Sequence, residues 1–438
     1  MFSYKCRLAA IVSFVFSLLI TGCGWSGFET RYEVNVTVSG LNGSGLILQN
    51  NGGNNLSVRS NGIVKFASYY DNGAKYAVTV LAAPSAPAQI CSLSNASGTI
   101  AAANVSNITL VCSNSDRFAY VANGGENTIS AYSINNNTGG LTSIVTTMNT
   151  GAAPAAMVVS SNASYLYTVN SANQSISSFA INASTGALTS VGNATSTGLT
   201  PISLTIGPSG KFLYVSNQFD NSVSGYSIDS NTGVLKSLGT PVAAGAGAGS
   251  ITIEPNGKFA YVANGSANSV SAFSINASTG ALSTAGTPVQ TGTSPSAMAI
   301  APNGKYAYIT NKSGNSIYAF SIDASTGALS KISEITAGKQ PSAIIIEPAG
   351  QFAYIANTSD NTVITYAIDN STGALSNVGT ITVKGALGIT AAKGYVYVTN
   401  SIDNTVLVYA MNASTGALSS VGAPIASGKN PVAIVTTN

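Results

Sequence analysis

Amide side chains recur at one position of a repeated segment in this chain, and they are its most regular candidates for ligand recognition. Each is followed by serine or threonine. The positions are Asn127, Gln174, Asn221, Asn268, Asn315, Asn361 and Asn404. Amides donate and accept hydrogen bonds without carrying charge, so a ring of them could hold a sugar or a peptide backbone. Because asparagine also makes tight turns and recurs in every repeat, we expect these side chains mainly to shape turns.

Carboxylates break this symmetry and are the remaining candidates for chemistry. Asp220, Asp360 and Asp403 directly precede the amide position in three repeats, and Glu126 does so in a fourth. Calcium prefers such oxygens, but no dense acidic loop is present, so we expect solvated charges and neither a metal site nor a cofactor. The chain has no histidine, no close cysteine pair and no phosphate-binding loop, which leaves no recognisable catalytic set.

The N-terminal segment predicts export and a lipid anchor. Lys5 and Arg7 precede an apolar stretch over 8–20 that is too short to span a bilayer, and small residues then lead to Cys23. This pattern resembles the bacterial lipobox, in which the cysteine thiol takes a diacylglyceryl group before cleavage makes it the new N-terminus. An ordinary export signal with an incidental cysteine is the alternative.

We therefore expect a signal peptide over 1–22 and a lipidated linker over 23–30, with the membrane as a partner through the lipid. Gly24, rather than an aspartate that would retain the protein at the inner membrane, follows the cysteine and favours the outer membrane. The body of the protein would then lie in the cell envelope, facing either the periplasm or the exterior.

Charge is scarce in this sequence, and its balance excludes one class of partner. Charged residues make up 7% of the chain, against about 25% in ordinary globular proteins. Basic and acidic side chains are equal in number over 114–438, so we expect no nucleic-acid partner. Polar residues are abundant, but 45% hydrophobic residues in regular alternation favour a buried core over disorder.

The region over 31–113 is expected to form a small β-sandwich, which we interpret as a stalk domain. Alternating runs over 32–38 and 76–80 are typical of strands, and Asn-Gly pairs separate the strands as turns. Cys91 and Cys112 form an even pair in an oxidising compartment, which predicts a disulfide. Two buried free thiols are the alternative.

The region over 114–438 is built on a repeated strand that carries tyrosine and ends in asparagine. Its copies are spaced 47, 47, 47, 47, 46 and 43 residues apart. The tyrosines are Tyr120, Tyr167, Tyr214, Tyr261, Tyr308, Tyr354 and Tyr397. Seven copies at the period of a four-stranded blade predict a seven-bladed β-propeller, an all-β fold. Thr-Gly recurs at the turn before each outer strand, where the glycine can take a positive φ.

Ring closure can also be predicted. The first repeat has no inner strand of its own before Tyr120, whereas the C-terminal end carries a spare one over 431–435. We expect this last strand to complete the first blade, which would leave no free sheet edge and give a monomeric ring.

The segment over 261–282 carries the motifs of a known family. Tyr-Val-x-Asn, then Asn-Ser-Val-Ser-Ala-Phe-Ser-Ile and Ser-Thr-Gly-Ala-Leu, resembles the YVTN and lactonase-type seven-bladed propellers. The resemblance covers 117–438. Members similar to 6-phosphogluconolactonase are hydrolases of sugar lactones, so the resemblance implies that activity.

The chain departs from the family at the residues that commonly act in it. Lactonase-type members commonly carry a histidine after the proline of an inner strand, and an arginine in an Asp-Leu-Gly-x-Asp-Arg run. Here the residues at the proline positions are Ala155, Ile202, Ser296, Ser342 and Val432. Arg117 is the only arginine of the propeller.

These departures decide the function that the sequence favours. Lactone hydrolysis needs a general base or an activated water, and a group that stabilises the oxyanion. We therefore expect an envelope-anchored propeller that binds a protein or glycan partner through the loops between second and third strands. A lactonase-like hydrolase of sugar lactones is the alternative, and a structural envelope protein is the second alternative.

Overall fold

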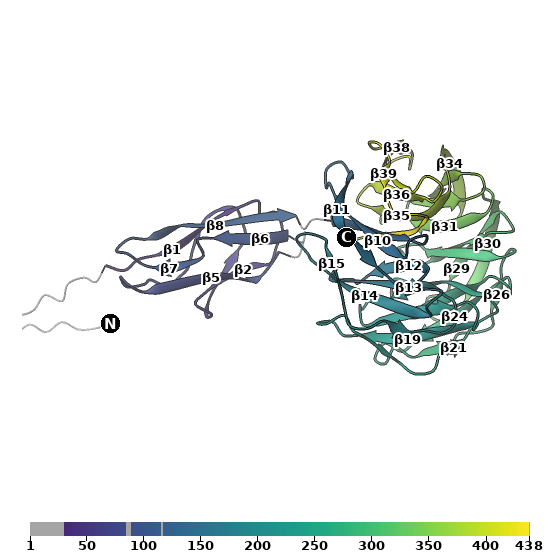
Figure 1. Ribbon diagram of the computed structural model, residues 1–438, viewed down its shortest axis with the longest axis horizontal. Coiled ribbons are helices and arrows are strands. Elements are labelled where there is room, and N and C mark those ends of the chain that lie inside the picture. Colours follow the sequence, from purple (N-terminus) through teal and green to yellow (C-terminus); the bar gives the residue numbers. More distant parts are fainter. Residues whose placement is uncertain (1–29, 85–88, 115–116, 438) are drawn as a thin grey trace, which may run out of the picture. The chain divides into compact units, whose positions relative to one another are not determined.

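The computed structural model describes residues 30–84, 89–114 and 117–437, and every regular element within them is a β-strand (Figure 1). The chain divides into two compact units, one that ends at Asn114 and another that begins at Ser115. The expected signal peptide over 1–22 and the expected lipidation of Cys23 lie outside the described residues. Within the described residues, no helix is long and apolar enough to cross a membrane.

The N-terminal unit is a pair of four-stranded sheets that share one core. Its strands are β1 (Val34–Ser39), β2 (Leu46–Asn50), β3 (Asn54–Val58), β4 (Gly62–Lys65), β5 (Lys75–Ala82), β6 (Gln89–Ser94), β7 (Ser97–Thr99) and β8 (Val105–Asn114). The sheet orders are β4-β1-β8-β6 and β3-β2-β5-β7. Alternate residues such as Val36, Leu48 and Leu110 pack between the sheets, so the predicted sandwich follows directly from the alternating sequence pattern.

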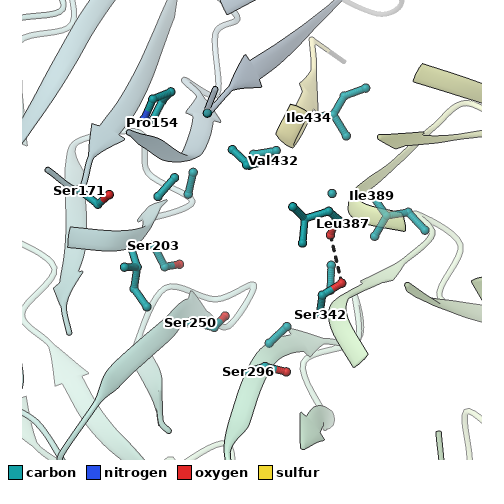
Figure 2. Close-up of a pocket in the computed structure, with 18 of the residues that line it drawn as sticks. Pro154, Ser171, Ser203, Ser250, Ser296, Ser342, Leu387, Ile389, Val432 and Ile434 are labelled. Carbon is teal, nitrogen blue, oxygen red and sulfur yellow. Dashed lines mark hydrogen bonds between the residues drawn. The ribbon is translucent and has the colours of Figure 1, made fainter. Parts of the chain in front are cut away.

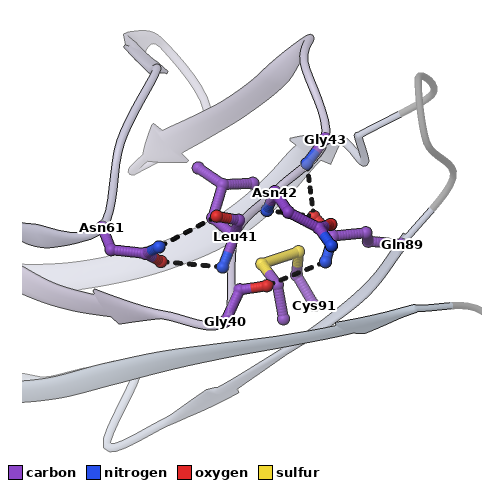
Figure 3. Close-up of a disulfide and its surroundings, with 8 residues drawn as sticks. Gly40, Leu41, Asn42, Gly43, Asn61, Gln89 and Cys91 are labelled. Atoms are coloured by element: carbon purple, nitrogen blue, oxygen red, sulfur yellow. Dashed lines mark hydrogen bonds between the residues drawn. A yellow bond between two sulfur atoms is a disulfide. The ribbon is translucent and has the colours of Figure 1, made fainter.

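A disulfide joins Cys91 and Cys112 inside one sheet of this unit. The two cysteines lie opposite each other where β6 pairs antiparallel with β8. Beside the bridge, the Gln89 side chain accepts hydrogen bonds from the Asn42 and Gly43 amides at 2.9 and 2.8 Å (Figure 3). The Gln89 Nε2 group donates to the Gly40 carbonyl at 2.8 Å, so the turn after β1 is fastened next to the disulfide.

The second unit is the predicted seven-bladed propeller, with inner, second, third and outer strand positions in each blade. From blade one to blade seven, the inner strands are β40 (Pro431–Thr436), β12 (Pro154–Val159), β17 (Pro201–Ile206), β22 (Ala248–Ile253), β27 (Pro295–Ile300), β31 (Pro341–Ile346) and β35 (Ala386–Ala392). The second strands are β9 (Arg117–Asn123), β13 (Tyr165–Asn170), β18 (Phe212–Asn217), β23 (Phe259–Asn264), β28 (Tyr306–Asn311), β32 (Phe352–Asn357) and β36 (Tyr395–Asn400). The third strands are β10 (Thr128–Ile134), β14 (Ser175–Ile181), β19 (Ser222–Ile228), β24 (Ser269–Ile275), β29 (Ser316–Ile322), β33 (Thr362–Ile368) and β37 (Thr405–Met411).

The outer position departs from the expected uniform four-stranded blade. Blades one, five and six have one continuous outer strand: β11 (Leu141–Asn149), β30 (Leu329–Thr336) and β34 (Leu375–Thr382). In the other blades the outer strand is split into β15 (Leu188–Ser190) and β16 (Thr195–Ser196), β20 (Leu235–Ser237) and β21 (Val242–Ala243), β25 (Leu282–Thr284) and β26 (Val289–Gln290), and β38 (Leu418–Ser420) and β39 (Ile425–Ala426). A glycine with positive φ lies in each break, because glycine adopts that backbone without strain; these are Gly192, Gly239, Gly286 and Gly422.

The last strand closes the ring as the sequence predicts. β40 pairs antiparallel with β9 in blade one, with Val435 opposite Tyr120 and Ile434 opposite Val121. Beyond the strand, the Phe118 amide donates to the Thr437 hydroxyl at 2.8 Å, and the Thr437 amide donates to the Phe118 carbonyl at 2.9 Å. Blade one is therefore completed by residues from the two ends of the propeller sequence.

The repeated tyrosine joins each blade to the next. Each of these side chains is fully buried, and its hydroxyl donates to the carbonyl of the Thr-Gly glycine in the following blade. The pairs are Tyr120–Gly186 (2.9 Å), Tyr167–Gly233 (3.0 Å), Tyr214–Gly280 (2.7 Å), Tyr261–Gly327 (2.9 Å), Tyr308–Gly373 (3.0 Å), Tyr354–Gly416 (3.0 Å) and Tyr397–Gly139 (3.1 Å). The last pair spans the closure, so the two most regular sequence motifs meet at every blade interface.

The glycine of that turn is required for two reasons. Gly280, for example, has φ +73°, and a Cβ atom there would lie 2.5 Å from the Phe212 ring of the preceding blade. Any larger residue would therefore be strained in its backbone and would also collide with an aromatic side chain.

Candidate functional site

The loops between second and third strands, together with the connections into the inner strands, form one face of the ring, here termed the loop face. All seven predicted amide residues lie on it with φ between +50° and +58°. Six asparagine Oδ1 atoms accept a backbone N–H from the connection that leads into the next inner strand. The pairs are Asn127–Ala153 (2.8 Å), Asn221–Gly247 (2.6 Å), Asn268–Ser294 (2.7 Å), Asn315–Gln340 (2.9 Å), Asn361–Gly385 (2.8 Å) and Asn404–Asn430 (2.7 Å).

These hydrogen bonds give the six asparagine side chains a role in holding the fold together. A left-handed turn residue that also holds the neighbouring loop explains why asparagine recurs at this position. Gln174 has the same turn conformation, and its backbone carbonyl accepts the Thr197 amide at 2.9 Å. The asparagine oxygens are thus used within the fold, and their amide nitrogens are the groups left for a ligand.

Three of the four loop-face carboxylates are also engaged. Asp220 accepts the Leu199 amide at 2.6 Å, and Asp360 accepts the Lys339 amide at 2.5 Å. Asp403 accepts the Asn400 Nδ2 group at 2.9 Å. The Glu126 carboxylate, in contrast, accepts no hydrogen bond from the described residues, which makes it the carboxylate of this face that is available to act on a ligand.

A pocket of about 590 Å³ lies on the axis of the ring (Figure 2). Residues from every inner strand line it, and Gly124, Ser171 and Asn430 of the loop face lie in its wall. The inner strands contact one another in sequence around the ring, including β35 with β40 and β40 with β12. The pocket is therefore the loop-face end of the central channel, where one small molecule could meet all blades at once.

The wall of this pocket carries hydroxyls but no ionisable side chain among the described residues. The Ser296 hydroxyl donates to the Pro341 carbonyl at 2.7 Å, and the Ser342 hydroxyl lies 3.3 Å from the Leu387 carbonyl. Ser203 accepts the Ile251 amide at 3.2 Å and so keeps its proton for a ligand. The Ser250 hydroxyl makes no hydrogen bond to the described residues, so it is fully available.

The single propeller arginine is not part of this site. Arg117 is 1% exposed, and its Nε donates to Asn136 Oδ1 at 2.8 Å. Its Nη1 and Nη2 atoms have no partner among the described residues. No group of three or more metal-ligating side chains occurs in the described part of the chain. The pocket itself thus offers neutral hydrogen bonds and apolar contact, and a general base would have to come from the loop face.

Sequence reasoning placed the candidate residues on the loop face, and it did not find the pocket. Ser203 and Ser250 lie two residues after the start of an inner strand, where each inner strand shifts its register against the second strand. That irregularity has no marker in the sequence pattern. One sequence signal could have indicated the pocket: the residue two positions after the start of the inner strand varies from blade to blade, although the other strands repeat.

An all-β ring of seven blades with a pocket at one end of its axis defines this protein as a seven-bladed β-propeller with a small-molecule-sized central site. The chain belongs to the family described as lactonase, 7-bladed β-propeller, whose sequence model matches residues 109–248, 242–342 and 331–436. A comparison with curated proteins found no match.

Solved structures share the fold at low sequence identity. A candidate 6-phosphogluconolactonase from Bacteroides fragilis aligns with a TM-score of 0.67 and 21% identity, over 74% of this chain and 99% of its own. The periplasmic gluconolactonase of Pseudomonas aeruginosa aligns with a TM-score of 0.63 and 17% identity, over 74% of this chain and 99% of its own. At these identities the likeness establishes the fold.

Proposed function

We propose that this protein binds an uncharged lactone in its central pocket and hydrolyses the ring. The observation that carries the proposal is the axial pocket itself, built by all inner strands of a lactonase-family propeller and lined by hydroxyls and apolar groups. Two of the fold neighbours bear the names of gluconolactonases, which gives lactones as the first ligand class to test. This favours the alternative from the sequence over partner binding through the loops.

Lactone hydrolysis determines which groups the site must provide. Water adds to the acyl carbon, the ring C–O bond breaks, and the product is a hydroxy acid that releases one proton at neutral pH. A base must take the proton of the attacking water, and hydrogen-bond donors must stabilise the oxyanion. Glu126 lies two residues after the pocket-lining Gly124 and is not held by an internal hydrogen bond, so we assign it as the candidate base.

Acid release from a panel of lactones tests this proposal. The full-length chain carrying Cys23→Ser, which removes the predicted acylation site, would be followed by titration at constant pH with spontaneous hydrolysis subtracted. Glu126→Gln should lower kcat by about 100-fold or more, as loss of a general base does. Asp220→Asn is the matched control, because that side chain holds the Leu199 amide. The absence of turnover in the parent chain would overturn the proposal.

A second candidate, docking of a protein or glycan partner on the loop face, rests on a different observation. Phe219 is 72% exposed and Ile402 is 61% exposed, and both lie in loops between second and third strands. The Leu199 carbonyl accepts the Phe219 amide, and the Leu199 side chain, 37% exposed, adds to the apolar surface there. Retention of one defined partner by the parent chain and its loss in Phe219→Ser would support this function, and equal retention by both would refute it.

A further inference from the structure

The residue types that line the central pocket differ from blade to blade, whereas the tyrosine and Thr-Gly motifs of the propeller repeat in every blade. The second and third residues of each inner strand face this region of the ring. From blade two through blade seven to blade one they read Ala155-Ala156, Ile202-Ser203, Gly249-Ser250, Ser296-Ala297, Ser342-Ala343, Leu387-Gly388 and Val432-Ala433. Four consecutive blades, three to six, thus supply one serine each, and the neighbouring blades seven and one supply leucine and valine. Ile202 of blade three is the aliphatic residue that accompanies the serines.

This distribution gives the pocket a hydroxyl side and an aliphatic side. Figure 2 shows Ser203, Ser250 and Ser296 together along one side of the space. Val432 and Ile434 lie across from them in the same view. A ligand that fills the space therefore meets hydrogen-bonding groups on one edge and alkyl groups on the other.

The aliphatic side is formed by adjacent strands that pack closely. Leu387 on β35 and Val432 on β40 are half-buried, so each keeps surface that a ligand could cover. Gly388 allows this approach, because a Cβ atom there would lie 2.9 Å from Ala433 Cα. No polar side chain interrupts Leu387, Ile389, Val432 and Ile434 within the pocket wall on these two strands.

Two serine hydroxyls on the hydroxyl side are free to donate a hydrogen bond to a ligand. Ser203 uses its oxygen as an acceptor for the Ile251 amide and retains its proton, and Ser250 is unengaged within the described residues. Ester and ring oxygens are acceptors, so these two serines suit the lactone group itself. A phosphate or carboxylate would in contrast be buried here without a cation, which costs far more than a neutral group does.

We infer that the pocket selects an uncharged lactone that bears an alkyl substituent over phosphorylated or polyhydroxylated lactones, with the ring on the serine side and the alkyl chain on the side of Leu387 and Val432. The lactone part of this inference rests on the proposed function, whereas the alkyl part rests on the wall alone. A polyhydroxylated ring would leave hydroxyls facing the aliphatic side without partners, and a short alkyl chain would cover that side.

The test is a homologous series of γ-lactones with methyl, butyl and hexyl substituents, compared with glucono-1,5-lactone and its 6-phosphate. Binding is measured by calorimetry on the full-length Cys23→Ser chain, so no detergent competes for the pocket. Affinity should rise about fourfold for each methylene group until the aliphatic side is covered. Leu387→Ser and Val432→Ser should flatten this dependence. Val378→Ser, which changes an exposed residue of the outer strand β34 outside the pocket wall, should leave it unchanged.

The outcomes separate the inference from the proposed function. Tighter binding of the gluconolactones, or a chain-length dependence that survives both pocket variants, overturns the inference and leaves lactone hydrolysis intact. The matching alkyl-substituted cyclic ethers serve as the second arm. If they bind with the same chain-length dependence while no lactone is opened, the proposed function fails and the two-sided pocket stands. If no alkyl ligand binds, the inference is refuted.

Discussion

Alkaline pH is expected to unfold this propeller through its ring of buried tyrosines. Burial raises the pKa of Tyr214 to about 12, and it raises the pKa of Tyr397 to about 12 although the nearby Arg117 opposes the shift. Burial raises the pKa of the other tyrosines of the ring as well: Tyr120, Tyr167, Tyr261, Tyr308 and Tyr354. Each hydroxyl must stay protonated to donate to its glycine carbonyl.

The direction of the pH dependence follows from the pKa of tyrosine in the folded and in the unfolded chain. In the unfolded chain a tyrosine ionises near pH 10, whereas Tyr214 in the ring holds its proton to about pH 12. The stabilisation is complete below pH 10 and is lost as the pH rises from 10 toward 12, because the unfolded chain then releases protons that the folded chain keeps. At pH 11 each such tyrosine lowers the free energy of unfolding by about 1.4 kcal/mol relative to its value at neutral pH.

The ring as a whole magnifies this effect. Seven tyrosines at about 1.4 kcal/mol each approach 10 kcal/mol at pH 11, which is comparable with the entire stability of a typical domain. We therefore expect the propeller to remain folded at pH 9 and to unfold near pH 11 without added denaturant. Urea melts at half-unit intervals between pH 8 and pH 11 measure the decline.

A single substitution isolates one member of the ring. Tyr214→Phe leaves the buried Gly280 carbonyl without its 2.7 Å donor and should cost about 1–3 kcal/mol at pH 8. The same variant should lose about 1.4 kcal/mol less than the parent between pH 8 and pH 11. Tyr318→Phe is the control, since that half-buried ring lies under the Lys331 ammonium and outside the ring of blade contacts. Tyrosinate absorbance that rises fully at pH 10 while the fold persists would refute the reasoning.

Three further predictions address the termini and the disulfide. Deletion of 431–438 removes β40, exposes the free edge of β9 and should lower the free energy of unfolding by about 3 kcal/mol or more; an unchanged melting temperature would contradict the closure. Cys91→Ser opens a bridge across a sequence separation of 21 residues and should destabilise the N-terminal unit by about 3 kcal/mol in urea melts; the parent chain under reducing conditions should match the variant, and a difference between them would contradict this account. Cys23→Ala should abolish palmitate labelling in the native host, and equal labelling of both forms would disprove the lipid anchor.

The sequence predicts the ring architecture because every blade needs the same interface contact and the same turn. Tyr-x-x-Asn and Thr-Gly recur since the tyrosine donates across each interface to the carbonyl of that glycine, and the Thr-Gly turn needs a positive φ. The spare strand at 431–435 was readable because the first repeat visibly lacked one. The disulfide between Cys91 and Cys112 was likewise predicted, because these two cysteines are the pair that remains once the cysteines of the N-terminal segment are set aside.

The site could not be read in the same way, because its residues do not repeat. Leu387, Val432 and Ser250 stand in ordinary strand positions, and only the closure of seven inner strands into a ring brings them around one space. The repeated amides were expected mainly to shape turns, and in the structure the Asn127 side chain and its asparagine counterparts hold the neighbouring loops. The residues of each repeat determine its own turns. Which side chains line the pocket is determined only when strands far apart in the chain come together around the axis.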